Sequence, residues 1–318
     1  MHKFHFVNIR RYFMNRKKPY QSCSLCPRNC KADRRMTTGF CGCKDTVKAA
    51  RAALHHWEEP CISGNQGSGT VFFSGCTLGC CFCQNHSISQ EHFGKELTVP
   101  QLARIFLDLQ EKGAHNLNLV TGTQYIPSIM EALDLIKPRL TIPVVYNCGG
   151  YESTELIREL EEYVDIWLPD LKYYSSSLSS RYSKAADYFD MASRAIKQMI
   201  SQTGAPEFDA SETLMKKGVI IRHMVLPGAR EDSIRLLHWM KEELPQGMYY
   251  ISLLSQYTPF YRSKDFPEIN RRITSYEYNK VLEEAIRLGL TQGFMQEKSS
   301  AKEEYTPPFD LEGIQSYI

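Results

Sequence analysis

The chain has 318 residues, of which 42% are hydrophobic and 23% are charged, and this suits one large globular domain with a small appendage. The formal net charge of +2 gives no bulk electrostatic reason to bind nucleic acid or a membrane surface, and we expect neither partner. No segment approaches the roughly 18 consecutive apolar residues of a membrane span, and no apolar stretch follows the basic residues at the start, so we expect a cytoplasmic protein.

Residues 1–45 form a basic leader and a cysteine-rich region. Nine of the 11 cysteines fall into two groups at short spacings, one within residues 23–43 and one within residues 76–83. Disulfide frameworks belong mainly to small secreted domains, whereas this chain is long and lacks an export signal. The cysteine spacings therefore favour metal binding.

The first cysteine group reads Cys-x2-Cys-x3-Cys over residues 23–30, followed by Cys-Gly-Cys at residues 41–43. Four sulfurs from two turns would close a tetrahedral zinc site or a second iron–sulfur cluster, and the spacing does not choose between the two. A site closed in this way is structural or transfers electrons. We expect the ligands to be Cys23, Cys26, Cys30 and one of Cys41 and Cys43, with Cys41 taken as the fourth.

Residues 46–69 are interpreted as a connector that ends in a flexible run rich in serine and glycine, and residues 70–296 as the core domain. The charged tail at residues 297–318 contains two adjacent prolines, and we expect it to be extended or loosely packed. Within the core we predict strands at residues 70–74, 116–121, 143–146, 164–168, 218–226, 249–254 and 293–295, and helices at residues 98–112, 126–137, 153–163, 178–202, 232–243 and 275–288.

The alternation of strands and helices predicts an α/β fold with a mainly parallel sheet. A doubly wound sheet and a complete or partial barrel are both compatible with the periodicity. In each of these architectures the chemistry lies at the carboxyl ends of the strands. A functional motif should therefore come directly after a predicted strand.

A group of three cysteines meets this condition. Cys76, Cys80 and Cys83 follow the predicted strand at residues 70–74 with Cys-x3-Cys-x2-Cys spacing, and Gly75 and Gly79 permit tight turns between them. Three thiolates on a four-iron cluster leave one iron open to a small molecule, whereas a carrier cluster is usually held by four cysteines. The spacing therefore indicates a catalytic 4Fe-4S cluster.

Two alternatives compete for the same loop. A zinc knuckle would need a fourth ligand, which His86 or Cys81 could supply. An electron-transfer iron–sulfur protein would need four protein ligands for each cluster, and this loop offers three in the usual spacing.

The Cys-x3-Cys-x-aromatic-Cys pattern after the first strand of an α/β barrel resembles the radical S-adenosylmethionine (SAM) superfamily. The resemblance implies a partial (β/α)6 TIM-like barrel, with the small cysteine-rich region at its amino terminus. It also implies that SAM binds the open iron of the cluster and is reductively cleaved to a 5′-deoxyadenosyl radical, which abstracts hydrogen from a substrate. Phe82 takes the aromatic position beside the adenine, and Asn85 is expected to contact SAM as well.

Five further segments resemble a narrower family, the radical SAM proteins similar to pyruvate formate-lyase activating enzyme. These are residues 69–76, 83–85, 118–121, 165–172 and 255–259, and the resemblance extends from about Cys23 to about Gln296. It implies an oxidoreductase that activates a glycyl radical enzyme, with flavodoxin or ferredoxin as the electron donor. A small-molecule substrate is the alternative within the same superfamily.

The narrower resemblance also implies SAM-binding residues. Asp170 and Lys172 match the Asp-Leu-Lys of the activases, and Arg222 matches an arginine on a strand that ends in Pro-Gly. Where the activases carry Gly-Gly-Glu, this chain has Thr121 and Thr123, whose hydroxyls and carbonyls can accept from an ammonium group without supplying its negative charge. The activases also have a histidine after a late strand, where this chain reads Leu-Ser-Gln-Tyr at residues 254–257.

Overall fold

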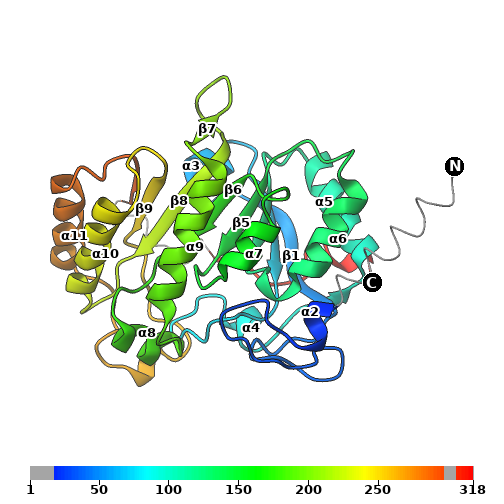
Figure 1. The fold of residues 1–318 in the computed structure, drawn as a ribbon, viewed down its shortest axis with the longest axis horizontal. Coiled ribbons are helices and arrows are strands. Elements are labelled where there is room, and N and C mark those ends of the chain that lie inside the picture. Colours follow the sequence, from blue (N-terminus) through cyan, green and yellow to red (C-terminus); the bar gives the residue numbers. More distant parts are fainter. Residues whose placement is uncertain (1–17, 297–305, 318) are drawn as a thin grey trace, which may run out of the picture.

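The computed structural model describes residues 18–296 and 306–317 (Figure 1). Most of the basic leader and part of the tail therefore lie outside the described residues. The described strands are β1 (Val47–His55), β2 (Ser68–Phe73), β3 (Lys95–Leu97), β4 (Leu117–Val120), β5 (Val144–Cys148), β6 (Ile166–Pro169), β7 (Glu207–Phe208), β8 (Met215–Met224), β9 (Tyr250–Leu254) and β10 (Gly293–Met295). The described helices are α2 (Lys18–Gln21), α3 (Pro60–Ser63), α4 (His86–Ser89), α5 (Val99–Glu111), η1 (Thr123–Tyr125), α6 (Ile126–Ile136), α7 (Thr154–Glu159), α8 (Ser176–Ser183), α9 (Tyr188–Thr203), α10 (Arg230–Glu243), η2 (Ser263–Asp265), α11 (Ser275–Arg287) and η5 (Gln315–Tyr317).

Within these residues the strands form one ten-stranded sheet in the order β10-β9-β8-β6-β5-β4-β2-β1-β3, with β7 paired to β8. The strands from β2 to β10 along this order are all parallel, whereas β1 and β3 extend the sheet in antiparallel pairings. The two end strands do not pair with each other, so the sheet is open. The predicted α/β class is confirmed, and the open parallel sheet is consistent with a partial barrel.

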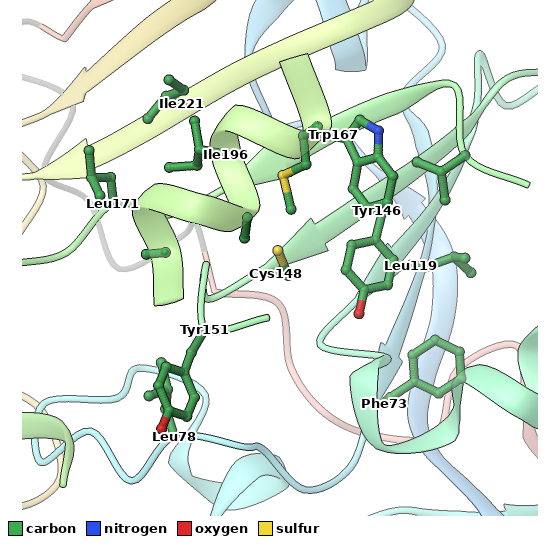
Figure 2. Packing of buried hydrophobic residues seen from close by; sticks show 14 of the residues in the cluster. Phe73, Leu78, Leu119, Tyr146, Cys148, Tyr151, Trp167, Leu171, Ile196 and Ile221 are labelled. Carbon is green, nitrogen blue, oxygen red and sulfur yellow. The ribbon is translucent and has the colours of Figure 1, made fainter. Parts of the chain in front are cut away.

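The parallel strands are buried on both faces, as such strands usually are. Every residue of β2, β4, β5 and β6 is buried. On the face toward the helices, Tyr146 and Trp167 pack edge to face with ring centroids 5.4 Å apart, and Ile196 of α9 lies over the same layer (Figure 2). Because successive side chains alternate between faces, the neighbouring residues point to the inside of the curved sheet.

The connector is more ordered than its sequence suggests. It contains β1, which pairs with β2 along its length, and α3, whose Cys61 and Ile62 pack against Val145 and Ile166 on the inner face of the sheet. Ser68 and Gly69, which the sequence places in a flexible run, are the first residues of β2. The β1 sequence is rich in alanine, which has a low strand propensity, so its strand conformation depends on pairing with its neighbours.

The described part of the tail corrects the expectation of loose packing. Leu311 donates a backbone hydrogen bond to Ala50 of β1 at 3.0 Å, and the Glu312 carbonyl accepts one from Ala52 at 2.8 Å. Ile314 is fully buried. The tail therefore packs beside β1, a strand that was not predicted from the sequence. For this reason the docking of the tail could not be predicted either.

The predicted helices are all present in the structure, but α7 ends at Glu159, short of the predicted residue 163, and one predicted helix is divided. The stretch at residues 178–202 is two helices, α8 and α9, because α8 ends at Lys184 in the left-handed conformation. Thr98 caps α5 and forms a capping box with Gln101. Among the described residues, no helix is long and apolar enough to cross a membrane.

Candidate active site

The three cysteines of the second group lie on the loop between β2 and α4, at the carboxyl edge of the parallel strands. Gly75 opens this loop with a φ of 84°, a conformation that favours glycine. A Cβ at this position would also collide with the Cys43 sulfur. The turn that presents Cys76 therefore requires glycine for its conformation and for the close approach of the first cysteine group.

Each of the three sulfurs has a hydrogen-bond partner. The Leu78 amide donates to the Cys76 sulfur at 3.4 Å, and the buried Ser183 hydroxyl donates to the Cys80 sulfur at 2.9 Å. The Cys83 sulfur lies 3.2 Å from the Ser89 hydroxyl. Hydrogen bonds to sulfur stabilise thiolates and help to set the reduction potential of an iron–sulfur cluster.

The three thiols lie within electrostatic reach of one another. Burial raises the pKa of Cys76, and the neighbouring Cys80 and Cys83 raise it further. Burial and Cys80 likewise raise the pKa of Cys83, to about 11. Three adjacent thiolates need positive charge to be stable, and the irons of a cluster would supply it.

These three cysteines supply the thiolate donors that a 4Fe-4S cluster takes. Within residues 18–296 and 306–317, no group of three or more histidine, cysteine, aspartate or glutamate side chains is placed to hold one ion. In a 4Fe-4S cluster each cysteine binds a different iron, so the sulfurs stand farther apart than around one zinc. His86 stacks on Tyr261, and Cys81 is buried in the main hydrophobic cluster, so both side chains take part in local packing.

A charged group lies beside the cluster loop. Asp170 follows β6, and its carboxylate pairs with the Lys172 ammonium at 2.6 Å and with the Arg222 guanidinium of β8 at 3.0 Å. Burial alone would raise the pKa of Asp170, but Arg222 and Lys172 outweigh burial and lower it. The positive charge of Lys172 opposes, without overcoming, the rise that burial and the neighbouring thiols cause in the pKa of Cys76 and Cys83. The structure thus brings the three predicted charged residues together, next to the cysteines.

Glu58 completes this network, although the sequence analysis assigned it no role. Its carboxylate accepts hydrogen bonds from Asn118 of β4 and Asn147 of β5, both at 3.1 Å, and lies 3.3 Å from Arg222. The adjacent Glu59 is also buried, and one of its carboxylate oxygens has no hydrogen-bond partner. Two consecutive glutamates in the connector were the only sequence signal, and only the fold shows that they reach the inside of the sheet.

The two threonines after β4 take different positions. Thr121 has a φ of 57°, and its carbonyl accepts from the Gln124 side chain at 2.7 Å. The same Gln124 amide donates to the carbonyls of Ser74 and Gly75, which ties this turn to the cluster loop. Thr123 is buried and donates its hydroxyl hydrogen to Glu152 at 2.8 Å.

Glu152 was also missed by the sequence analysis. It follows β5 after two glycines, so its position after a strand was the signal that could have identified it. Burial raises its pKa to about 8, against the opposing effect of the Thr123 hydrogen bond. The turn after β4 lacks the glutamate of the activase Gly-Gly-Glu. A carboxyl group is nevertheless present beside Thr123, because Glu152 supplies it from the turn after β5.

The remaining predicted SAM contacts lie on the cluster loop. Phe82 is buried, and its ring packs edge-on against Tyr257 with centroids 5.7 Å apart. Asn85 stands immediately before α4, and its side chain makes no capping hydrogen bond to that helix. Tyr257 lies in residues 254–257, the segment that stands where the activases have a histidine. This segment therefore packs against Phe82.

The first cysteine group packs directly against the cluster loop. The Cys43 thiol donates to the carbonyls of Cys41 at 3.3 Å and Ser74 at 3.4 Å. Arg28 donates to the Thr77 carbonyl at 2.9 Å, so it links the two cysteine groups as well. The hydrogen bond with Cys43, opposed by burial and supported by Arg34, lowers the pKa of Cys41 to about 6.

Comparisons with known proteins agree with this geometry. Residues 70–240 match the family described as the radical SAM superfamily. An uncharacterized protein of Methanocaldococcus jannaschii is 31% identical over 287 residues, which cover 86% of this chain and 77% of that protein.

Three solved structures are more distant relatives. SuiB of Streptococcus suis bound to its precursor peptide has a TM-score of 0.45 at 14% identity, over 70% of this chain and 46% of SuiB. The [FeFe]-hydrogenase maturase HydG has a TM-score of 0.44 at 16% identity, over 69% of this chain and 48% of that chain. Methylornithine synthase has a TM-score of 0.45 at 14% identity, over 87% of this chain and 68% of that chain. The chain thus spans less than half of the first two, and similarities this distant carry no argument about its activity.

The family match covers more than half of the chain and includes the three-cysteine loop. Membership of this family implies a 4Fe-4S cluster and SAM. The chain belongs to the radical SAM superfamily.

Proposed function

We propose that this protein reductively cleaves SAM at a 4Fe-4S cluster held by Cys76, Cys80 and Cys83, and that the resulting radical abstracts hydrogen from a substrate. The observation that carries the proposal is the three-cysteine loop at the carboxyl edge of β2, in which each sulfur has a hydrogen-bond partner. When bound, the cluster supplies the electron that cleaves SAM to methionine and a 5′-deoxyadenosyl radical.

The residues around the loop support this chemistry. The positive charge of Lys172 acts on Cys76 and Cys83, and its pairing with Asp170 holds it in place. The SAM carboxylate is a suitable partner for Lys172 or Arg222. The packing of Phe82 against Tyr257 fixes the position of the Phe82 ring on the loop.

A glycyl radical enzyme is the finer proposal for the substrate, with flavodoxin or ferredoxin as the electron donor and the cytoplasm as the compartment. The support for it is the set of activase-like segments, above all Asp170 and Lys172. Incubation with a pyruvate formate-lyase, SAM and a reductant should give a glycyl radical in the electron paramagnetic resonance (EPR) spectrum. Cleavage of SAM without a glycyl radical would point to another substrate, including a small molecule.

The test of SAM cleavage uses protein purified and reconstituted without oxygen. After reduction and addition of SAM, mass spectrometry should detect 5′-deoxyadenosine. Cys76→Ala should abolish the product because it removes one of three cluster ligands. Cys81→Ala is the matched control, since Cys81 lies on the same loop and is not a ligand. Equal product from both variants would contradict the ligand assignment.

A further inference from the structure

The first cysteine group is organised as two closed loops. In one, Cys23 and Ala32 are joined by a backbone hydrogen bond of 3.0 Å, and Lys31 donates back to Cys23 at 2.9 Å. In the other, Gly39 donates to the Cys43 carbonyl at 3.1 Å. Two short loops that each present cysteines are the usual way in which a chain surrounds a metal centre.

A buried cation lies between these loops. Arg34 is fully buried, and its guanidinium donates to the carbonyls of Cys43 at 3.0 Å and Gln124 at 2.7 Å, and to that of Lys44. No carboxylate forms an ion pair with Arg34 in the part of the chain that the structure describes. A buried charge without a counter-charge is strongly unfavourable, so an anion is expected beside this guanidinium.

Cysteine sulfurs occupy the place where that anion is needed. The guanidinium lies 3.9 Å from the Cys23 sulfur. A Cβ built on Gly39 would lie 3.3 Å from the Arg34 side chain, 3.4 Å from the Cys30 sulfur and 3.5 Å from the Cys41 sulfur. Arg34 and sulfurs from both loops therefore meet around Gly39.

Cys26 belongs to the same group, because it lies on the first loop between Cys23 and Cys30, in a turn where Asn29 donates to its carbonyl at 3.0 Å. Cys43 does not belong to it. The Cys43 thiol lies against the carbonyls of Cys41 and Ser74, and it packs against Gly75 of the other cysteine loop. The structure thus separates Cys41 from Cys43, which the sequence left as alternatives.

We propose that Cys23, Cys26, Cys30 and Cys41 bind a second iron–sulfur cluster, and that Arg34 is the buried counter-ion of its negative charge. Each thiol releases its proton as it binds iron. A single zinc ion held by the same four sulfurs is the competing occupant, and metal analysis distinguishes the two. Four cysteine ligands leave no iron open, so this cluster is expected not to bind SAM.

A variant of Arg34 tests the counter-ion role. Arg34→Met removes the charge with a side chain that fills similar space, whereas Arg34→Lys retains the charge. Loss of the cation destabilises the reduced, more negative cluster, so the reduction potential of the second cluster should fall in Arg34→Met and lie close to wild type in Arg34→Lys. Equal potentials in all three proteins, measured by redox titration with EPR, would contradict the counter-ion role.

The direct test isolates the second cluster in the full chain. The triple variant Cys76→Ala, Cys80→Ala, Cys83→Ala lacks the first cluster, so its metal content does not depend on whether SAM is cleaved. After reconstitution without oxygen, we expect about four irons and about four sulfides per chain, and a reduced EPR signal that SAM leaves unchanged. One zinc per chain without iron, or no metal, would overturn the proposal.

Single variants give an independent reading if the triple variant does not fold. In the otherwise wild-type chain, Cys26→Ala should lower the iron content from about eight to about four per chain. Cys43→Ala is the matched control and should keep about eight. Equal iron content in the two variants would overturn the assignment of ligands.

Discussion

The hydroxyl of Ser183 donates its hydrogen to the Cys80 sulfur from the last residue of α8, and the hydroxyl is also 2.7 Å from that of Tyr173. A hydrogen bond to a thiolate stabilises the reduced cluster more than the oxidised one, because the reduced cluster carries more negative charge. Ser183→Ala should therefore lower the reduction potential of the first cluster by tens of millivolts.

Redox titration followed by EPR measures this shift. Ser179→Ala is the matched control, since this buried serine lies on the same helix and donates to the Ser176 carbonyl. A potential that rises, or that falls equally in both variants, would show that the hydrogen bond to sulfur does not tune the cluster.

Glu152 makes folding stability depend on pH. Burial raises its pKa to about 8 in the folded protein, whereas the unfolded chain releases the proton near the ordinary value of about 4.3. The protonated carboxyl group of Glu152 therefore stabilises the folded state, and this contribution is fully present below the pKa of the unfolded chain. It is lost as the pH rises to about 8, by up to about 5 kcal/mol of unfolding free energy. Glu152→Gln should remove this dependence, so it should gain stability relative to wild type from about pH 5 to about pH 8. Denaturant unfolding at both pH values measures the difference, and parallel stability curves would contradict the assigned protonation.

The role of a residue can be predicted from the sequence when that role follows from the spacing of nearby residues. The three cysteines of the cluster loop belong to this class, because a short loop after a strand determines their proximity. Glu58 does not, because its partners lie on strands far away in the sequence. Arg34 does not either, because it joins the nearby Cys43 to the distant Gln124. Their roles depend on burial, which no local pattern of charged residues reveals.

At the scale of elements, the alternating strands and helices of the core are predictable and β1 is not. The strands β2, β4, β5 and β6 are buried along their whole length, whereas in β1 a pair of alanines follows each of Lys48 and Arg51. Its conformation depends on β2 on one side and on the tail on the other. Arg51 of β1 also pairs with Asp310 at 3.0 Å.

The docking of the tail on β1 should contribute to stability. Ile314 is fully buried, so Ile314→Ala should lower the free energy of unfolding by about 2–5 kcal/mol. Ser316→Ala is the control, since Ser316 is exposed in the same segment. Denaturant unfolding of both variants checks the prediction, and an unchanged midpoint for Ile314→Ala would mean that the tail is not part of the cooperative unit.

At the scale of the whole molecule, the open parallel sheet gathers the chemistry at one edge. Its strands place Asp170 and Arg222 beside the loop of Cys76. The cysteine-rich region packs against the same loop through Arg28 and Cys43. Both cysteine groups are therefore neighbours in space, although the connector and β1 separate them in the sequence.

The central claim is that the loop cluster has an open iron to which SAM binds. The most direct measurement is the EPR spectrum of the reduced protein with and without SAM, in the Cys26→Ala variant, where the first cluster is the one expected to remain. A SAM-dependent change in the spectrum is predicted, together with loss of that signal when Cys83→Ala is added. A fully reduced loop cluster whose spectrum SAM does not alter would contradict the account.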